Sequence, residues 1–261
     1  MFILLVAGAV GFTSCKKDSA TVAGDEISAT TLSQIASHGF GTSNVQRTED
    51  GYLVEGDINL TDAYLNSAPG GNYLRIANTE QYRTTALVNG PRNITVAMDS
   101  KLAAKPGYIQ ALDELVRRYN AENLSLTFSR VSSGADITYV SGNGSYLASA
   151  GFPTGGSPYN QVKVNARAIG EGTSSTFINY LASIISHEAG HCIGFRHTDY
   201  MDRSYSCGGS TSNEGASTVG AILIPGTPSG PDAGSWMLAC TGSGVNRPFN
   251  ANDKTALNYL Y

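Results

Sequence analysis

One stretch of eleven residues, 187–197 (HEAGHCIGFRH), limits what this chain can be more than any other part of the sequence. It holds three of the four histidines in the chain, His187, His191 and His197. A helix places residues four positions apart on one face, so His187 and His191 can bind one metal ion together. Gly194 can adopt a positive φ without steric cost, and a turn there would bring His197 to the same ion as a third ligand.

The residue types in this stretch indicate which metal is bound and what it does. Three imidazoles leave one position open on a tetrahedral zinc ion, and a catalytic zinc uses that position for water. Glu188 adjoins the first ligand and is placed to take a proton from that water. We therefore expect one catalytic Zn²⁺, with Glu188 as general base. The alternative is a chance cluster of histidines, and the added glycine and third histidine argue against it.

Composition argues against several other classes of protein. The 261 residues are enough for one large domain, or a pair of small ones, with a real core. The formal net charge is −4 and the 17 lysines and arginines are scattered, so we expect no nucleic-acid partner. A serine or cysteine nucleophile is not expected, because the histidines near the site are committed to metal. The glycines of residues 142–144 lack the lysine and helix start of a phosphate-binding loop.

The first residues predict export. Residues 1–12 are almost wholly apolar but too short for a lasting transmembrane helix. Cys15 follows two small residues and precedes a polar tail, which resembles a bacterial lipoprotein cleavage site, although no basic residue precedes the apolar run. We expect a signal peptide over 1–14, lipid attachment at Cys15 and a tether over 15–25. An ordinary secretory signal is the alternative. Either way the protein is exported, to the cell envelope or beyond, and meets a membrane only through that anchor.

Export would allow disulfides among the remaining cysteines, Cys192, Cys207 and Cys240. Because three is an odd number, one of them stays free. We favour a Cys207–Cys240 pair, since both residues lie in the loop-rich part after the histidine motif. A Cys192–Cys207 pair stays open, because sequence alone does not fix connectivity.

Hydrophobic periodicity predicts an α+β fold. We expect strands over residues 94–98, 124–131, 135–140 and 161–165, and helices over 108–120 and 174–192. A weak helical pattern covers 27–35, and a strand-like run with a Gly-Asp break covers 51–60. Irregular chain follows the histidine motif to residue 250, apart from 221–224, and a terminal helix is expected over 252–261 with Asn250 or Asn252 as its cap.

The motif has the form HExxHxxGxxH, and in this form the sequence resembles the metzincin zinc peptidases. It is most similar to the bacterial dual-action HEIGH metallo-peptidases, through residues 52–58, 81–84, 151–153, 197–199 and 249–254, although Ala189 stands where the family name implies isoleucine. The resemblance implies a zincin-like fold: a twisted mixed sheet with a backing helix and an active-site helix, then a loop-rich C-terminal subdomain ending in a helix. It also implies hydrolysis of internal peptide bonds in proteins by a zinc-bound water that Glu188 activates.

The same resemblance implies a Met-turn beneath the zinc ligands. Residues 235–237 (SWM) have the required form, whereas Met201 lies too close to His197 to loop underneath it. Met237 would support the site without binding the metal, and the alternative is an ordinary core methionine. Residues 224–232, just before this turn, are expected to wall the pocket beyond the scissile bond.

Features of related metzincins are only partly present. Astacin-like metzincins carry a tyrosine two residues after the methionine, where this chain has Ala239. Tyr200 and Tyr205 are candidates for stabilising an oxyanion instead, against the simpler expectation that they pack or face solvent. Residues 144–153 resemble the substrate-binding edge strand of matrixins, with a surface loop as the alternative. No second histidine zinc site is expected, because only His38 remains.

Residues 54–58 (VEGDI) resemble the pro-segment of astacins, in which an aspartate caps the zinc. A carboxylate is a competent zinc ligand and would displace the catalytic water. Residues 26–80 are therefore a candidate pro-segment, Asp57 a candidate latency ligand, and residues 81–261 the catalytic domain of a monomer that acts on proteins or peptides. The alternative at Asp57 is a plain Gly-Asp turn between strands. A second function class is an inactive surface binding or adhesion lipoprotein on a protease scaffold, against which the intact Glu188 argues.

Overall fold

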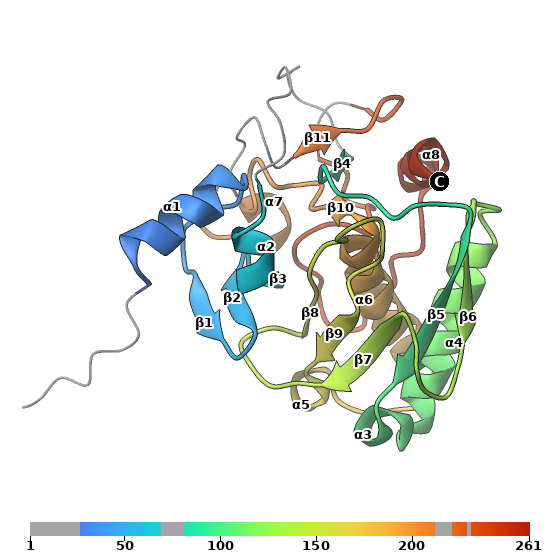
Figure 1. Ribbon diagram of the computed structural model, residues 1–261. Coiled ribbons are helices and arrows are strands. Elements are labelled where there is room, and N and C mark those ends of the chain that lie inside the picture. The colour runs from blue at the N-terminus through green and yellow to red at the C-terminus, as the bar shows by residue number, and fades with distance from the viewer. Residues whose placement is uncertain (1–26, 69–80, 212–220, 229–230) are drawn as a thin grey trace, which may run out of the picture.

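The computed structural model describes residues 27–68, 81–211, 221–228 and 231–261 (Figure 1). The expected signal peptide, the tether and Cys15 lie outside the described residues, as does the end of the candidate pro-segment. Within these ranges, no helix is both long enough and apolar enough to cross a bilayer.

A five-stranded mixed sheet forms the centre of the fold, in the order β6-β5-β7-β9-β8 (Figure 1). Four strands run parallel: β5 (Arg92–Met98), β6 (Leu126–Arg130), β7 (Ile137–Ser141) and β9 (Gln161–Val164). The edge strand β8 (Ala148–Ser149) pairs antiparallel with β9. The four longer strands lie where the hydrophobic pattern predicts them, and the expectation of a mixed sheet is confirmed.

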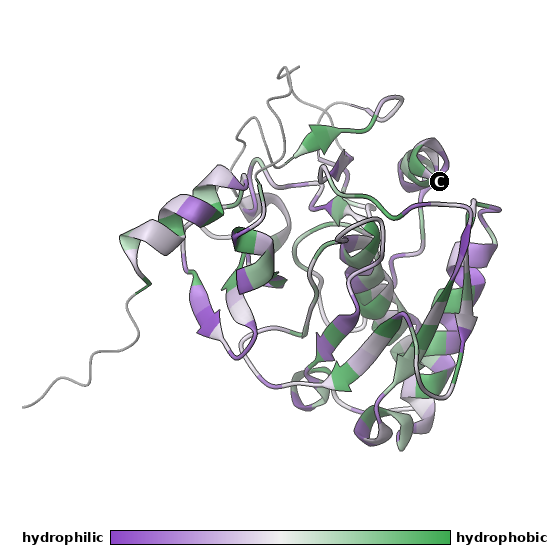
Figure 2. Ribbon diagram, in the orientation of Figure 1, coloured by the Kyte–Doolittle hydropathy of each residue, from purple (hydrophilic) through white to green (hydrophobic). Residues whose placement is uncertain are grey.

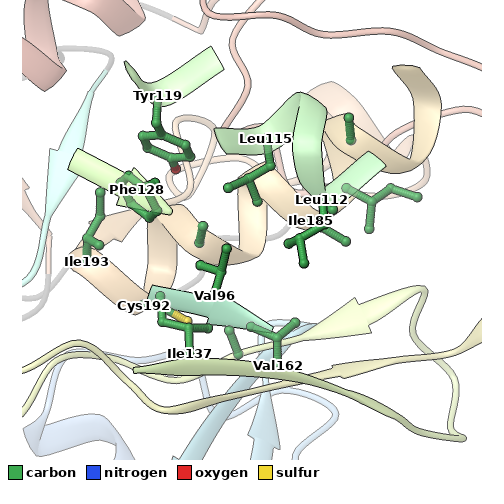
Figure 3. Packing of buried hydrophobic residues seen from close by; sticks show 14 of the residues in the cluster. Val96, Leu112, Leu115, Tyr119, Phe128, Ile137, Val162, Ile185, Cys192 and Ile193 are labelled. Carbon is green, nitrogen blue, oxygen red and sulfur yellow. The ribbon is translucent and has the colours of Figure 1, made fainter. Parts of the chain in front are cut away.

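Two long helices pack together over this sheet. The backing helix α4 (Pro106–Asn120) begins with proline, which fits a first turn because that turn needs no backbone donor. The long helix α6 (Ser175–Ile193) is buried from Tyr180 onward and is mostly hydrophobic in Figure 2. The Tyr119 hydroxyl of α4 donates to the Ser186 carbonyl of α6 at 2.9 Å. Figure 3 shows how side chains from both helices and the sheet fill one core, among them Leu112, Leu115, Ile185, Val96, Ile137 and Val162.

The chain beyond α6 forms the loop-rich part of the fold. A small sheet has β4 (Tyr82–Arg83) at its centre, flanked by β10 (Phe195–Arg196) and β11 (Ile222–Leu223). The terminal helix α8 (Ala251–Leu260) begins at a capping box made by Asn250 and Asp253. The short helix α7 (Ser204–Cys207) also follows α6, whereas the short helices α3 (Ser100–Ala103) and α5 (Ala166–Ile169) lie earlier in the chain. The α+β class and the terminal helix are confirmed.

The N-terminal segment, residues 27–68, builds a sheet and a core of its own. Its elements are α1 (Ala29–Ser37), β1 (Gln46–Thr48), β2 (Gly51–Val54), β3 (Ile58–Thr61) and α2 (Asp62–Leu65), and its sheet has the order β1-β2-β3. The core of this segment includes Ile35, Phe40, Val54 and Ile58, and Phe152 of the main body packs into it. The segment therefore lies against the main body near β8, on the side where that sheet ends (Figure 1).

Candidate metal centre

Four side chains from three parts of the chain meet at one point. His187 and His191 lie one turn apart on α6, His197 follows β10, and Asp57 comes from the turn between β2 and β3. One ligand atom from each lies within 4.8 Å of all the others. Gly194 ends α6 in the left-handed conformation, with φ of 116°, so that β10 can leave the helix sharply and bring His197 back to the cluster.

The hydrogen bonds of two imidazoles show that the cluster suits a cation. Nδ1 of His187 lies 2.9 Å from the Trp236 carbonyl oxygen, and Nδ1 of His191 lies 2.8 Å from that of Phe195. A carbonyl only accepts, so each Nδ1 carries the proton and each neutral ring keeps a bare Nε2. The two Nε2 atoms lie 3.1 Å apart, where their lone pairs would repel each other unless a cation lay between them. The donor set therefore fits Zn²⁺.

The surroundings of His191 favour its neutral, ligating form. Burial lowers the pKa of His191 well below its ordinary value, and the nearness of the His187 and His197 rings lowers it further. A neutral imidazole is the form that binds metal, so this environment is ready for an ion without losing a proton first.

Asp57 completes the cluster from the N-terminal segment. Its Oδ1 lies 3.1 Å from Nε2 of His197, and its Oδ2 lies 3.6 Å from Nε2 of His187. Burial alone would raise the pKa of Asp57, but attraction to His197 and His187 wins and holds it well below its usual value. Asp57 is therefore the carboxylate, negatively charged, that faces the histidines.

The backbone before Asp57 is a left-handed turn, with φ of 52° at Glu55 and 87° at Gly56. Glycine is favoured at position 56 by this positive φ, and a Cβ atom there would also displace the guanidinium of Arg203, which lies 2.3 Å from its position. The plain Gly-Asp turn between strands is therefore present, and it is the same turn that delivers Asp57 to the histidines. That Asp57 keeps the protein latent stays a prediction.

Glu188 lies beside the cluster and is only 3% exposed. Its Oε2 has no hydrogen-bond partner among the residues that the structure describes. Burial raises the pKa of Glu188 well above its ordinary value, and the charge of Asp57 adds to the rise, while His197 opposes it. A divalent cation at the histidines would favour the charged form of the carboxylate, which is the form that accepts a proton.

Met237 lies against α6 and is fully buried. A Cβ atom on Gly190 would lie 2.6 Å from the Met237 sulfur and 2.5 Å from the Trp236 ring. The Thr198 amide donates to the Met237 carbonyl at 2.9 Å, which ties the turn to the chain just after His197. The need for glycine at position 190 was not predicted from the sequence.

Asp253 is a second residue whose role was not predicted from the sequence. It holds residues 235–237 in place through hydrogen bonds. Its carboxylate accepts hydrogen bonds from the side chains of Gln81 (2.6 Å) and Ser235 (3.0 Å) and from the amides of Trp236 (3.2 Å) and Asn250 (2.9 Å). Burial, the largest effect, raises the pKa of Asp253 to about 7. Since the Trp236 carbonyl accepts from His187, Asp253 stands behind the first metal ligand. The asparagine–aspartate spacing of the capping box was the available signal.

Replacing Asp253 with alanine should lower the free energy of unfolding by about 3 kcal/mol, because four donors would lose their acceptor. Urea unfolding of the full chain measures this loss. Asn258→Ala is the matched control on the exposed face of α8 and should change stability by less than about 0.5 kcal/mol. A loss at position 253 no larger than in this control would contradict the role given to Asp253.

The same pair of proteins makes a pH test. The folded pKa of Asp253, about 7, exceeds the value of about 3.9 for an unfolded aspartate, so its proton stabilises the folded state more as the pH falls through 7. The stability gap between parent and Asp253→Ala should therefore widen between about pH 8 and about pH 5. A gap that stays constant over this range would show that Asp253 is charged in the folded state.

A cavity of about 340 Å³ opens beside Asp57, His187 and Glu188. Its apolar wall includes Leu147, Ile184 and Leu238, and residues 239–241, Arg203 and Arg247 complete the other side. The expectation that residues 224–232 wall this pocket is wrong for the part of that stretch that the structure describes. β11 pairs with β4, and the Ile224 amide donates to Gln81 at 2.9 Å, which holds this stretch on the small sheet.

Neither candidate tyrosine lines this cavity. Tyr200 is buried and packs edge-on against Tyr82, with ring centroids 4.3 Å apart, whereas Tyr205 is 45% exposed. Cys207 and Cys240 form a disulfide, with the sulfurs 2.07 Å apart, and Cys192 is a buried free thiol. The disulfide ties α7 to the chain that walls the cavity.

The N-terminal segment occupies the edge of the main sheet at Ala150. The Asn59 amide donates to the Ala150 carbonyl at 2.7 Å, and the Ala150 amide donates to the Asp57 carbonyl at 3.0 Å. These two bonds form a parallel bridge between Ile58 and Ala150. Residues 57–59 therefore already pair with Ala150, within the stretch 144–153 that resembles a substrate-binding edge. His38 is elsewhere, with Nε2 3.1 Å from the Leu65 carbonyl.

One protein family and several solved structures are similar to this chain. Residues 53–261 match the family described as dual-action HEIGH metallo-peptidase. Among solved structures, myroilysin is similar at 16% identity over 68% of this chain and 96% of its own, with a TM-score of 0.42. High choriolytic enzyme 1, a hatching-enzyme zinc protease of the medaka fish Oryzias latipes, is similar at 16% identity over 68% of this chain and 92% of its own, with a TM-score of 0.34. No curated protein matches.

The family match begins at Leu53, so it includes Asp57 as well as the histidine motif and residues 235–237. The expected metzincin-type fold is confirmed. Because the match covers most of the chain, and because the motif residues gather into a cluster that suits zinc, this chain belongs to the dual-action HEIGH metallo-peptidase family: it is a zinc metallopeptidase, and its substrates are proteins or peptides.

Proposed function

We propose that this protein is an exported zinc metalloendopeptidase that is made in a latent form. The observation that carries the proposal is the meeting of His187, His191, His197 and Asp57 at one point, with Glu188 beside them. The three histidines belong to the peptidase motif, and the aspartate comes from a separate segment that also covers the neighbouring sheet edge. An active site and its own blocking group would give this arrangement.

The chain's own residues account for the chemical steps. His187, His191 and His197 hold one ion, and the carbonyls of Trp236 and Phe195 orient the first two rings. When bound, Zn²⁺ lowers the pKa of a water molecule and polarises the scissile carbonyl. Glu188 accepts the proton of the attacking water and passes it to the leaving amine. The main-chain groups of Ala150 would align an extended substrate by adding it to the sheet edge.

Latency follows from what the N-terminal segment occupies. Asp57 takes the place next to the histidines that the attacking water needs, and residues 57–59 take the hydrogen bonds of Ala150 that a substrate needs. We propose that residues 26–80 are a pro-segment and that residues 81–261 are the catalytic domain that its removal unblocks. The unblocked enzyme would work as a monomer, because these groups all come from one chain.

Export is proposed from the sequence of the first residues. An apolar run over 1–12 followed by Cys15 supports a lipoprotein signal, lipid attachment at Cys15 and a tether over 15–25. The Cys207–Cys240 disulfide is in keeping with an oxidising compartment. The enzyme would then act at the cell envelope or outside the cell.

The test is zinc content together with chelator-sensitive cleavage. The full chain, loaded with zinc, is assayed on casein before and after limited proteolysis that releases the N-terminal segment, with release checked by mass spectrometry. We expect one zinc per chain, little cleavage before release, clear cleavage afterwards, and loss of cleavage when a chelator is added. One bound zinc with no cleavage after release would instead favour the inactive binding or adhesion lipoprotein.

A further inference from the structure

Arg196 is the largest fully buried side chain in the described residues, and it immediately precedes the ligand His197. Its Nη2 donates to both carboxylate oxygens of Glu55, at 2.7 and 2.8 Å. Its Nη1 donates to the Gly39 carbonyl at 3.0 Å, and its guanidinium lies 4.3 Å from the centre of the Phe40 ring. Every one of these partners belongs to the N-terminal segment.

The main body alone does not satisfy this cation. Within the described parts of residues 81–261, no side chain or carbonyl accepts a hydrogen bond from Arg196. Its backbone is held independently, because β10 pairs with β4. A buried guanidinium without a carboxylate is strongly disfavoured, so Glu55 is what makes the burial of Arg196 tolerable. Removal of the segment would leave a bare cation next to the metal centre.

The position of Glu55 in the segment also shows where a carboxylate of a bound substrate would reach Arg196. Glu55 lies two residues before Asp57, and Asp57 both faces the histidines and bonds to the sheet edge at Ala150. The Gly41 amide adds a 3.0 Å bond to Glu55, so the carboxylate is fixed in place. A peptide seated at the same edge would bring a side chain near its scissile bond within reach of Arg196.

We propose that, in the unblocked enzyme, Arg196 selects substrates that carry an acidic side chain close to the scissile bond. The proposal rests on the proposed function, and it adds a substrate class to it. A guanidinium binds a carboxylate through two parallel bonds, which is the geometry it already has with Glu55.

Phe152 gives the same site an apolar side. Its ring stacks on Phe40 at 5.5 Å and meets His191 edge-on at 5.6 Å, so removal of the segment would bare this ring too. Neither Arg196 nor Phe152 lines the cavity beside Glu188. The acidic side chain and the side chain that fills that cavity therefore belong to different residues of the substrate.

The experiment compares matched peptides after release of the segment. The zinc-loaded full chain is freed of its segment by limited proteolysis and given a peptide library in which one position at a time carries Glu or its isostere Gln. At one position near the cleaved bond, we expect the parent to prefer Glu over Gln by roughly 10- to 100-fold in kcat/KM. Arg196→Gln should reduce this ratio to below about twofold, and Arg196→Lys should restore part of it.

A double variant serves as the control for misfolding of the latent form. Arg196→Gln alone leaves Glu55 buried without its cation, so Glu55→Gln/Arg196→Gln is made as well. Both yield the same unblocked enzyme, because Glu55 leaves with the segment. Arg130→Gln, an exposed arginine on β6 that pairs with Asp113, should leave the ratio as in the parent.

A parent that cleaves Glu and Gln peptides equally at every position would overturn the proposal, and so would a preference that survives Arg196→Gln. Failure of the proposed function looks different, because then no peptide of any kind is cleaved in a chelator-sensitive way. A binding measurement covers that case. The affinity of the metal-free, segment-free protein for an acidic peptide is measured by fluorescence anisotropy. Arg196→Gln should weaken this affinity at least about fivefold, and an unchanged affinity would count against Arg196.

Discussion

Glu188→Gln should lower kcat/KM of the unblocked enzyme by roughly 100- to 10,000-fold, while the protein still binds one zinc per chain. Glutamine keeps the size of the side chain but cannot accept a proton from the attacking water. The ligands His187, His191 and His197 are untouched, so metal content should not change. Casein cleavage and zinc analysis on the same samples measure both effects.

A second glutamate separates this effect from a general loss of charge. Glu171 is exposed and pairs with Lys105, away from the metal centre, so Glu171→Gln should cleave casein at the parent rate. If Glu188→Gln also cleaved at the parent rate with zinc in place, proton transfer by Glu188 would have to be abandoned. Loss of zinc in that variant would point to a structural role for the carboxylate instead.

The parts of the site that could be predicted from the sequence are those encoded locally. His187 and His191 are one helical turn apart, and the glycine at 194 that turns the chain towards His197 is only three residues further along. The helices α4 and α6 were predicted for a similar reason, since an apolar stripe at helical spacing is visible within one element. Strands of two residues, such as β4 and β10, are too short to show any period.

The parts that could not be predicted depend on contacts between distant residues. Arg196 looks like an ordinary charged residue in the sequence, and its burial follows from Glu55, 141 positions away. Asp253 meets Gln81 across 172 positions. The wall of the cavity was assigned wrongly for the same reason, because the pairing of β11 with β4 decides where residues 221–228 go. No local pattern carries such information.

The turn at Asp57 shows how two interpretations of one motif can be compatible. A glycine–aspartate pair between two short strands predicts a tight turn, and the structure has that turn. The resemblance to astacin pro-segments adds that the aspartate faces a metal. The left-handed backbone at Glu55 and Gly56 makes both true, since it turns Asp57 towards the histidines and Glu55 towards Arg196. The turn therefore places two carboxylates in two different sites.

Asp57→Asn should raise the casein-cleaving activity of the full chain, with its segment still attached, by at least about tenfold over the parent. The amide is close to the carboxylate in size but is a much weaker metal ligand, and it loses the attraction to the histidines that holds the pKa of Asp57 down. The rise should stay below the activity reached after proteolytic release, because residues 57–59 would still occupy the edge at Ala150. Activity before and after release is measured on each sample.

Asp62 provides the matched control within the same segment. It is exposed and pairs loosely with Arg47 at 3.7 Å, so Asp62→Asn should leave the full chain as silent as the parent. If Asp57→Asn is equally silent with its segment attached, yet fully active once the segment is released, then the segment blocks by covering the sheet edge and not through its carboxylate. If both variants are active before release, the substitutions have weakened docking of the whole N-terminal segment. Only activation confined to Asp57→Asn makes this aspartate the group that keeps the enzyme latent.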